Sequence, residues 1–322
     1  MTKKKILIVT GDPNSINSEL IFKVWNKLNK NVKKRIYFIS NYKLLRSQFN
    51  KLKYSIKIEK VINIDKENAK SSLKIIDVNL NFKSPFKVNF RSSSNFVLNS
   101  LNLAHNLSLK KNVKGLINCS IDKKLLKKRN IGVTEFLASK CKIKDNSEVM
   151  LIRNKNLSVS PITTHIDIKE IQKKLKSSII VKKIKIINNW YYKKFSKKPK
   201  IAILGLNPHN AEFRKNSEEK RIIYPAILKL KKLKIKVDGP LVSDTLFINN
   251  YKNYDVIIGM YHDQVLAPFK TLFKFDAINV TLGLKYLRVS PDHGTATDLI
   301  GKHSANEDSL HSCIKFIEKF GE

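Results

Sequence analysis

Short apolar runs rich in β-branched residues recur along the chain, and several are separated by longer segments of helical spacing. Runs of this length, bounded by polar residues, are typical of buried strands. The predicted strands cover residues 6–9, 36–39, 115–118, 149–152, 201–204, 256–258 and 277–280. The predicted helices cover residues 16–28, 96–109 and 218–233, the last with Ile222, Ala226, Ile227 and Leu230 on one face. Strands alternating with helices indicate a mostly parallel sheet covered on both faces.

The length of 322 residues is typical of two domains with a sizeable core. The sequence contains no internal repeat, coiled coil or low-complexity linker. Composition alone therefore places no domain boundary.

The formal net charge of +37 raises the question of a nucleic-acid partner. Only eight of the 63 basic residues are arginine, the residue preferred for bidentate recognition of phosphates and bases. The lysines are spread through every segment, without a basic tail or an aromatic-interleaved stripe. We therefore expect a solvated lysine-rich surface rather than a nucleic-acid site. Its positive field favours the approach of an anionic, phosphorylated substrate.

Three widely spaced cysteines, Cys119, Cys141 and Cys313, fit a reducing compartment better than a disulfide framework. The apolar run near the start, residues 6–9, is too short for a signal peptide. No apolar stretch approaches the roughly 20 residues that span a bilayer. The sequence thus predicts a soluble, cytoplasmic protein without a membrane partner.

Polar residues that could bind ligands or take part in catalysis follow the predicted strands, which is where catalytic groups gather in parallel sheets. Three of the seven histidines, His165, His209 and His262, lie after an apolar strand. Their wide separations match no local zinc motif, and a lone histidine is more often structural. Asn279 lies inside an apolar strand, where an unpartnered amide is penalised, so a ligand contact is favoured there.

No Gly-x-Gly-x-x-Gly nucleotide motif occurs in the chain. The loop His293-Gly294-Thr295 is the better cofactor candidate, because Thr295 with Asp298 is typical of a helix-starting cap. Free backbone N–H groups at such a helix start can face a nucleotide phosphate. An ordinary capped helix is the alternative interpretation.

An ordered set of motifs covers the chain from residue 10 to about 310 and resembles the 4-hydroxythreonine-4-phosphate dehydrogenase family of pyridoxal phosphate biosynthesis. The motifs are Thr-Gly-Asp-Pro at 10–13, Thr-Glu-Phe-Leu-Ala at 134–138, Thr-Thr-His at 163–165, Gly-Leu-Asn-Pro-His at 205–209, Gly-Pro at 239–240, Asp-Thr-Leu-Phe at 244–247, Tyr-His-Asp-Gln at 261–264, Lys270, Asn-Val-Thr-Leu-Gly-Leu at 279–284, Arg288 and Asp-His-Gly-Thr-Ala at 292–296.

The resemblance implies NAD- and metal-dependent oxidation of 4-phosphooxy-L-threonine, with decarboxylation of the product to 3-amino-2-oxopropyl phosphate. It implies that His165, His209 and His262 bind the metal. Imidazole ligands make zinc the first expectation, with cobalt or magnesium as alternatives. The implied substrate-binding residues are Thr134, Lys270, Asn279 and Arg288. Asp244 and Lys123 are the implied candidates for the catalytic base. A His-Gly-Thr-Ala loop of this kind lies beside the nucleotide in related dehydrogenases, which supports His293, Gly294 and Thr295 as cofactor-binding residues.

The fold implied by the resemblance is a two-domain α/β/α structure similar to isocitrate and isopropylmalate dehydrogenases, with the active-site cleft between the domains. We expect a first α/β domain at 1–128 plus 295–322 and a second at 129–294. The resemblance also implies a homodimer whose active sites lie at the subunit interface.

The chain departs from the family pattern at Val133, where the family has a substrate-contacting histidine. Valine neither hydrogen-bonds nor titrates, so that contact is lost. Glycines of the family pattern near residues 15–19 and 210–214 are also replaced, which restricts loops that approach ligands. Three alternatives therefore stay open: a sister dehydrogenase acting on threonate or erythronate 4-phosphate, a binding protein without turnover, and a nucleic-acid-binding protein.

Overall fold

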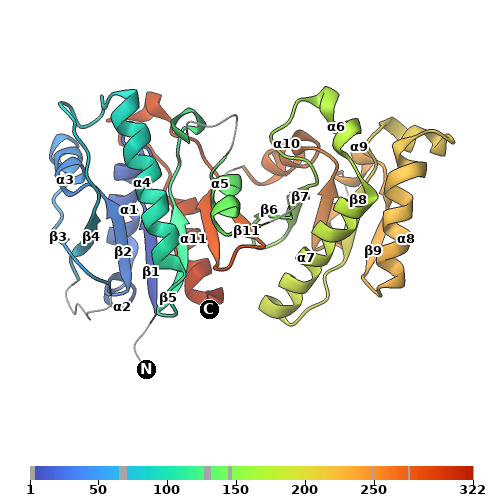
Figure 1. The fold of residues 1–322 in the computed structure, drawn as a ribbon, viewed down its shortest axis with the longest axis horizontal. Coiled ribbons are helices and arrows are strands. Elements are labelled where there is room, and N and C mark those ends of the chain that lie inside the picture. The colour runs from blue at the N-terminus through green and yellow to red at the C-terminus, as the bar shows by residue number, and fades with distance from the viewer. Residues whose placement is uncertain are drawn as a thin grey trace. The chain divides into compact units, whose positions relative to one another are not determined.

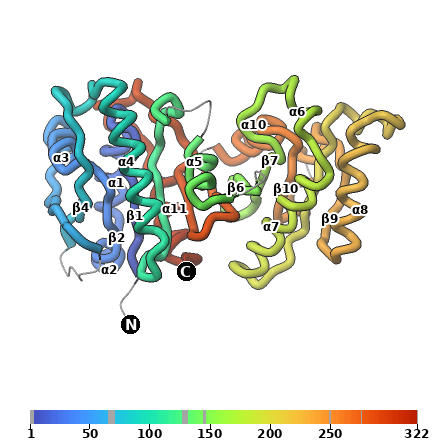
Figure 2. Tube along the Cα trace, in the orientation of Figure 1, coloured from blue at the N-terminus to red at the C-terminus, as the bar shows by residue number. Residues whose placement is uncertain are grey.

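The computed structural model describes residues 4–64, 71–126, 132–143, 147–248, 250–274 and 276–321. The chain divides into two compact units: unit 1 comprises residues 1–141 and 284–322, and unit 2 comprises residues 142–283. Figure 2 follows the chain from unit 1 into unit 2 and back. The predicted boundaries at 128/129 and 294/295 differ from these. Residues 284–294 belong to unit 1 because they include a strand that pairs with the first-unit strand 113–118.

Unit 1 has a parallel sheet in the order β3-β4-β2-β1-β5-β12. Its strands are β1 (Lys5–Val9), β2 (Ile36–Ser40), β3 (Ile58–Lys60), β4 (Leu73–Asp77), β5 (Val113–Asn118) and β12 (Arg288–Pro291). Its helices are α1 (Asn17–Lys27), α2 (Lys30–Lys33), α3 (Tyr42–Lys51), α4 (Phe90–Ser108), α5 (Val133–Lys140) and α11 (Asp308–Phe320), with 3-10 turns η1 (Lys123–Leu126) and η5 (Thr297–Leu299).

Helices cover both faces of the unit 1 sheet. Both faces need this cover because successive apolar side chains of a strand point to opposite faces. Leu7 of β1 packs with Phe96 and Leu101 of α4 in one buried cluster. On the other face, Gly115 of β5 lies against Ile317 of α11, whose Cδ1 is 3.0 Å from the position a Cβ would occupy. Figure 1 shows α4 crossing in front of the strands of this unit.

Unit 2 has a mixed sheet in the order β11-β6-β7-β10-β8-β9. Its strands are β6 (Val149–Arg153), β7 (Ser158–Pro161), β8 (Ile201–Leu204), β9 (Val237–Leu241), β10 (Val256–Gly259) and β11 (Ile278–Leu282). Only β6 is antiparallel to its neighbours within the described pairings of this unit. Its helices are α6 (Ile168–Lys174), α7 (Ser177–Phe195), α8 (Tyr224–Lys232), α9 (Ser243–Leu246) and α10 (His262–Phe273), with a π-helical turn η3 (Glu219–Ile223) and 3-10 turns η2 (Pro208–Phe213) and η4 (Asn250–Asn253).

Two groups of helices pack against the strands of unit 2. Val159 of β7 and Ile257 of β10 pack in one cluster with Phe269 of α10. The helices α7 and α8 pack against each other, α7 on β6 and β11 and α8 on β9. The sequence-based prediction of an α/β fold with a large, mostly parallel sheet is confirmed. Each of the seven predicted strands and three predicted helices is present, although α4 begins at Phe90 rather than at residue 96.

Two local predictions were wrong. The segment 218–233 begins with the π-helical turn η3, and that wider turn makes Ile223, rather than Ile222, the fully buried residue at its start. No capped helix begins at Thr295: the short turn η5 follows Ala296 in a left-handed conformation, without a side-chain cap.

Within the part of the chain that the structure describes, no helix is long and apolar enough to cross a membrane.

Candidate functional site

The three candidate histidines of unit 2 follow three neighbouring parallel strands. The strand β10 lies between β7 and β8, and it is parallel to both. His165 follows β7, His209 follows β8 and His262 follows β10. Because the carboxyl ends of parallel strands meet at one edge of the sheet, the fold brings these three loops to the same edge of unit 2.

His165 and His262 lie close together at this edge. Their ring centroids are 5.9 Å apart, with an angle of 40° between the ring planes. Two imidazoles bound to one cation with metal–nitrogen distances of about 2.1 Å have centroids about 5 to 6 Å apart. The Nδ1 atom of His262 lies 2.6 Å from Oδ1 of Asp263, so the carboxylate orients the ring and leaves Nε2 for a cation. These two residues fit a shared divalent metal.

His209 lies in the same edge region but on an unusual backbone. It is exposed, and residues 209–213 all have φ between 45° and 56°. A left-handed turn of non-glycine residues costs about 1–2 kcal/mol per residue. No group of three or more candidate ligands is formed among the described residues of the single chain. The structure thus brings together two of the three predicted ligands, and the complete trio stays a prediction.

Gln264, in the first turn of α10, connects the loop before His262 to the loop that leads to His209. Its Oε1 accepts a hydrogen bond from the backbone N–H of Met260 at 2.6 Å. Its Nε2 donates to the carbonyl oxygen of Gly205 at 2.6 Å and to Oγ of Ser243 at 2.8 Å. Thr163 extends this connection, since its Oγ1 donates to the Met260 carbonyl oxygen at 2.7 Å. One amide thus joins the loops after β8, β9 and β10.

Glu219 is fully buried and holds the loop that leads to His209. One carboxylate oxygen accepts backbone N–H groups of Leu206 and Asn207, both at 2.8 Å. Burial alone raises the pKa of Glu219, but the hydrogen bonds from Asn207 and Leu206 outweigh it and leave the pKa below its usual value. No sequence pattern indicated this role, because Glu219 is one of two adjacent glutamates in the polar Ser-Glu-Glu-Lys segment at 217–220.

The other predicted residues of unit 2 lie on neighbouring elements. Asp244 is exposed on α9, directly after the Ser243 that Gln264 contacts. Lys270 is exposed on α10. Asn279 lies on β11, where its buried Oδ1 accepts no hydrogen bond from the described residues. An uncompensated buried amide oxygen is costly, so a donor on a bound ligand would relieve it.

Arg288 and Thr134 are in contact in unit 1. Arg288 is only 2% exposed, and its Nη1 donates to Oγ1 of Thr134 at 3.1 Å. Its Nε donates to Oδ1 of Asn118, the last residue of β5, at 2.7 Å. Burial lowers the pKa of Arg288 to about 10, and the nearby Glu135 partly opposes this effect. The guanidinium therefore remains charged at neutral pH and holds the start of α5 to the end of β5.

The predicted cofactor loop lies at the carboxyl edge of the unit 1 sheet. His293, Gly294 and Thr295 follow β12, and the Thr295 carbonyl oxygen accepts the backbone N–H of Ile16 at 3.2 Å. Gly294 is exposed, and a Cβ there would meet nothing within 4 Å. Lys123 is exposed in η1 after β5, in the neighbouring loop.

The chain order reverses in unit 1 between β1 and β5, the position where open parallel sheets bind ligands. Asp12 follows β1 there, and its Oδ1 accepts the backbone N–H of Asn14 at 2.8 Å. Burial raises the pKa of Asp12, while its backbone hydrogen bonds oppose the shift. Gly11 has a φ of 79° and approaches the Ser120 carbonyl oxygen so closely that a Cβ would lie 2.4 Å from it. The Gly-Asp motif therefore serves a tight turn at this edge.

Comparison with known proteins covers nearly the whole chain. Residues 31–317 match the family model described as pyridoxal phosphate biosynthetic protein PdxA. The 4-hydroxythreonine-4-phosphate dehydrogenase of Aquifex aeolicus is 38% identical over 320 residues, which cover 98% of each chain.

The crystal structure of 4-hydroxythreonine-4-phosphate dehydrogenase from Klebsiella pneumoniae aligns with a TM-score of 0.83 at 26% identity and covers 98% of this chain and 97% of that one. The isocitrate dehydrogenase of Methylococcus capsulatus shares the fold, with a TM-score of 0.51 at 10% identity over 98% of this chain and 84% of that one. The chain therefore belongs to the PdxA family of pyridoxal phosphate biosynthesis, whose matching relatives are named as dehydrogenases.

Proposed function

We propose that this protein is an NAD- and divalent-metal-dependent dehydrogenase that oxidises 4-phosphooxy-L-threonine. The product, a 2-amino-3-oxo acid, then loses CO2 to give 3-amino-2-oxopropyl phosphate, a step of vitamin B6 biosynthesis. The pairing of His165 with His262 at the carboxyl edge of the unit 2 sheet is the observation that carries this proposal, together with family membership.

The proposed metal ligands are His165, His209 and His262. Asp263 supports the donor set, because its contact with Nδ1 of His262 orients the imidazole toward a cation. Zinc is the first expectation, with cobalt or magnesium as alternatives. A bound cation would supply Lewis acidity toward the substrate oxygen, and NAD would supply the hydride acceptor.

The chain's own residues have the tasks of binding, orienting and moving a proton. Lys270 offers a point charge for phosphate or carboxylate, and Asn279 offers a buried amide oxygen that lacks a donor. Arg288 acts from a buried position and orients Thr134 toward substrate. Asp244 is the proposed base that takes the hydroxyl proton, with Lys123 as the second candidate.

The loop of His293, Gly294 and Thr295 is the proposed contact for the NAD phosphates. Its position at the carboxyl edge of the parallel unit 1 sheet supports this role, since nucleotides bind at that edge in open α/β sheets. Exposed Gly294 leaves room for a close approach of ligand to backbone.

The proposed partners are the phosphorylated substrate and a second copy of the chain. The described residues of one chain provide two close imidazoles but no group of three ligands. A homodimer with its active sites at the subunit interface is the proposed assembly. The proposed location is the cytoplasm.

A sister activity on threonate or erythronate 4-phosphate is the second candidate, and Val133 is the observation that favours it. Val133 is the first residue of α5 and packs against the hydrophobic core of unit 1. It therefore presents no hydrogen-bonding group where the family has a histidine. A substrate that lacks the amino group is compatible with this change.

The test is NADH formation with each of the three phosphorylated acids, before and after chelation and with zinc restored. Metal-dependent turnover of 4-phosphooxy-L-threonine supports the first candidate. Turnover of a threonate or erythronate phosphate alone supports the second. Bound metal and NAD without turnover of any of the three acids would contradict both.

A further inference from the structure

A cavity of about 160 Å³ lies in unit 2 at the opposite edge of the sheet from the histidines. The turn between β6 and β7, the C-terminal end of α7 and the residue before β10 line it. Its lining includes Asn154, Ser158 and Asp255, and the latter two lie at the amino ends of β7 and β10. Those strands are four residues long, so the cavity is separated from the His165 and His262 loops by about 13 Å of strand.

Asn154 lines this cavity and has an unused buried donor. The residue is 8% exposed. Its Oδ1 accepts the backbone N–H groups of Asn156 and Leu157, both at 2.9 Å. Its Nδ2 is buried and has no hydrogen-bond partner among the described residues. An orphaned buried donor costs about 1–3 kcal/mol, which a ligand oxygen at this position would recover.

The charges around the cavity favour an anion. Arg153 lines it, with its guanidinium 4.7 Å from the ring centroid of Phe195, and exposed Lys155 contributes a second positive charge. The carboxylate of Asp255 is already engaged: Oδ1 pairs with Nζ of Lys197 at 2.6 Å, and Oδ2 accepts the backbone N–H of Lys200 at 2.9 Å. The acidic group is thus neutralised, and the donors of the lining dominate.

The volume limits the ligand to a small molecule, since a cavity of about 150 Å³ holds a benzene-sized ligand of about six heavy atoms. We propose that this cavity is a binding site for a small oxyanion, a carboxylate or a phosphate, held by the Asn154 amide and by the charges of Arg153 and Lys155. The site is separate from the proposed active site and does not depend on the proposed function.

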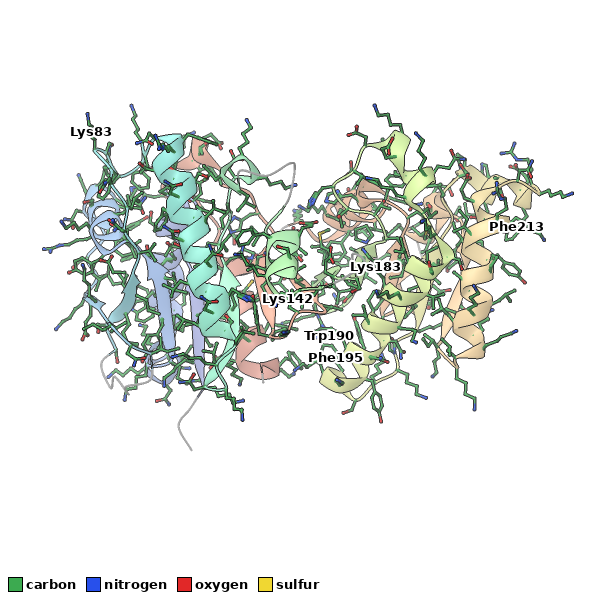
Figure 3. The ribbon with its side chains drawn as sticks, in the orientation of Figure 1. Lys83, Lys142, Lys183, Trp190, Phe195 and Phe213 are labelled. Carbon is green, nitrogen blue, oxygen red and sulfur yellow. The ribbon has the colours of Figure 1, made fainter. Side chains whose placement is uncertain are left out.

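Trp190 provides a local reporter. Its ring centroid is 5.5 Å from that of Tyr191 and 5.4 Å from that of Phe195, both of which line the cavity. Figure 3 shows Trp190 and Phe195 near one another at the C-terminal end of α7. The chain has two tryptophans, so Trp25→Phe in unit 1 leaves Trp190 as the single tryptophan emitter.

The experiment titrates the Trp25→Phe protein with inorganic phosphate and, separately, with malonate, against chloride at equal ionic strength. We expect a saturable change in Trp190 emission. Saturation by malonate alone assigns a carboxylate ligand, saturation by phosphate alone assigns a phosphate ligand, and saturation by both assigns a general oxyanion site. No saturable change with either probe overturns the proposal.

Asn154→Asp tests the donor directly, because its carboxylate keeps the Oδ1 contacts of the turn but replaces the donor with a negative charge. We expect affinity to fall by about tenfold or more, as for a lost charge-assisted hydrogen bond. Should this variant not fold, Lys155→Glu on the exposed rim gives the same test, with Lys193→Glu on α7 as the charge-matched control outside the lining. Equal affinities in Lys155→Glu and Lys193→Glu would overturn the assignment.

Discussion

The Nε2 atom of Gln264 donates a hydrogen bond to the carbonyl oxygen of Gly205 at 2.6 Å, across 59 residues of sequence. Gly205 begins the loop that leads to His209, and Gln264 lies two residues after His262. The bond therefore fixes the loop after β8 to the first turn of α10. A Cβ at Gly205 would lie 2.0 Å from Oδ1 of Asn210, so any other residue at this position would force the Asn210 side chain to move.

Gln264→Ala should destabilise unit 2 by about 2 kcal/mol, because it leaves the Met260 N–H and the Gly205 carbonyl oxygen without their partner. Urea unfolding followed by Trp190 emission, in the Trp25→Phe background, measures this cost. Gln172→Ala is the control, since Gln172 makes one exposed bond to Glu218, and its replacement should cost within about 0.5 kcal/mol. Equal unfolding midpoints for the two variants would contradict the connecting role of Gln264.

Asp263→Ala should lower affinity for a divalent metal by about 10- to 100-fold, the usual effect of losing a carboxylate that orients a ligand histidine. The Asp263 side chain is 81% exposed, so stability should change little. Competition with a chromogenic chelator measures the affinity. Asp276→Ala, which removes an exposed carboxylate beyond α10, is the control and should leave the affinity unchanged. A normal affinity in Asp263→Ala would separate this carboxylate from metal binding.

The free energy of unfolding should fall in acid because Glu219 becomes protonated. Its folded-state pKa lies below the usual value of 4.5, so its contribution is fully present above about pH 4.5 and is lost as the pH drops through the folded pKa. Glu219→Gln should cost about 1–3 kcal/mol at neutral pH. The gap in the free energy of unfolding between this variant and the natural protein should narrow in acid. Urea unfolding across the acid range measures the gap, with exposed Glu212→Gln as the control. A gap that is independent of pH would show that the charge of Glu219 is not responsible.

Arg288→Lys should destabilise unit 1 by about 2–4 kcal/mol, because an ammonium group cannot reach both Asn118 and Thr134 in the geometry of the guanidinium. Trp25 emission during urea unfolding, in a Trp190→Phe background, reports this unit. Arg91→Lys, an exposed substitution on α4, should leave the midpoint unchanged. If Arg288→Lys retained full stability, Arg288 would have no role in holding α5 to β5.

Val133→His should increase kcat/KM for 4-phosphooxy-L-threonine, because the imidazole restores a hydrogen-bonding group at the start of α5. Loss of the partly buried valine from the unit 1 core should cost about 1 kcal/mol of stability. Steady-state kinetics with 4-phosphooxy-L-threonine and with threonate 4-phosphate checks the effect. A gain for threonate 4-phosphate alone would favour the sister activity.

The sequence predicted the elements whose residues are strongly apolar. The runs 6–9, 201–204 and 256–258 form central strands because they are buried on both faces of their sheets. By contrast, β12 begins with Arg288 and α7 carries lysines through its apolar face, so neither has a clear periodic signal. The three predicted metal-binding histidines follow β7, β8 and β10. Because these strands are parallel neighbours, their loops lie at one edge of the unit 2 sheet.

The contacts that support the site could not be predicted in the same way. The bonds of Gln264 and Glu219 depend on loops far apart in sequence meeting in space. The left-handed turn at 209–213 has no glycine to indicate it, and the Ala296 turn replaces the helix that the Thr295 and Asp298 spacing predicted. Local sequence patterns specify elements, whereas these features arise from tertiary packing.

Metal-dependent NADH formation is the decisive measurement for the proposed dehydrogenase activity. The protein is stripped with a chelator and assayed with 4-phosphooxy-L-threonine and NAD before and after zinc is restored, in parallel with His262→Ala and with His311→Ala, a histidine of α11 in unit 1. We expect turnover to be lost on stripping, to return with zinc in the natural protein and in His311→Ala, and to stay absent in His262→Ala. Turnover that survives stripping, or that His262→Ala retains, would contradict this expectation.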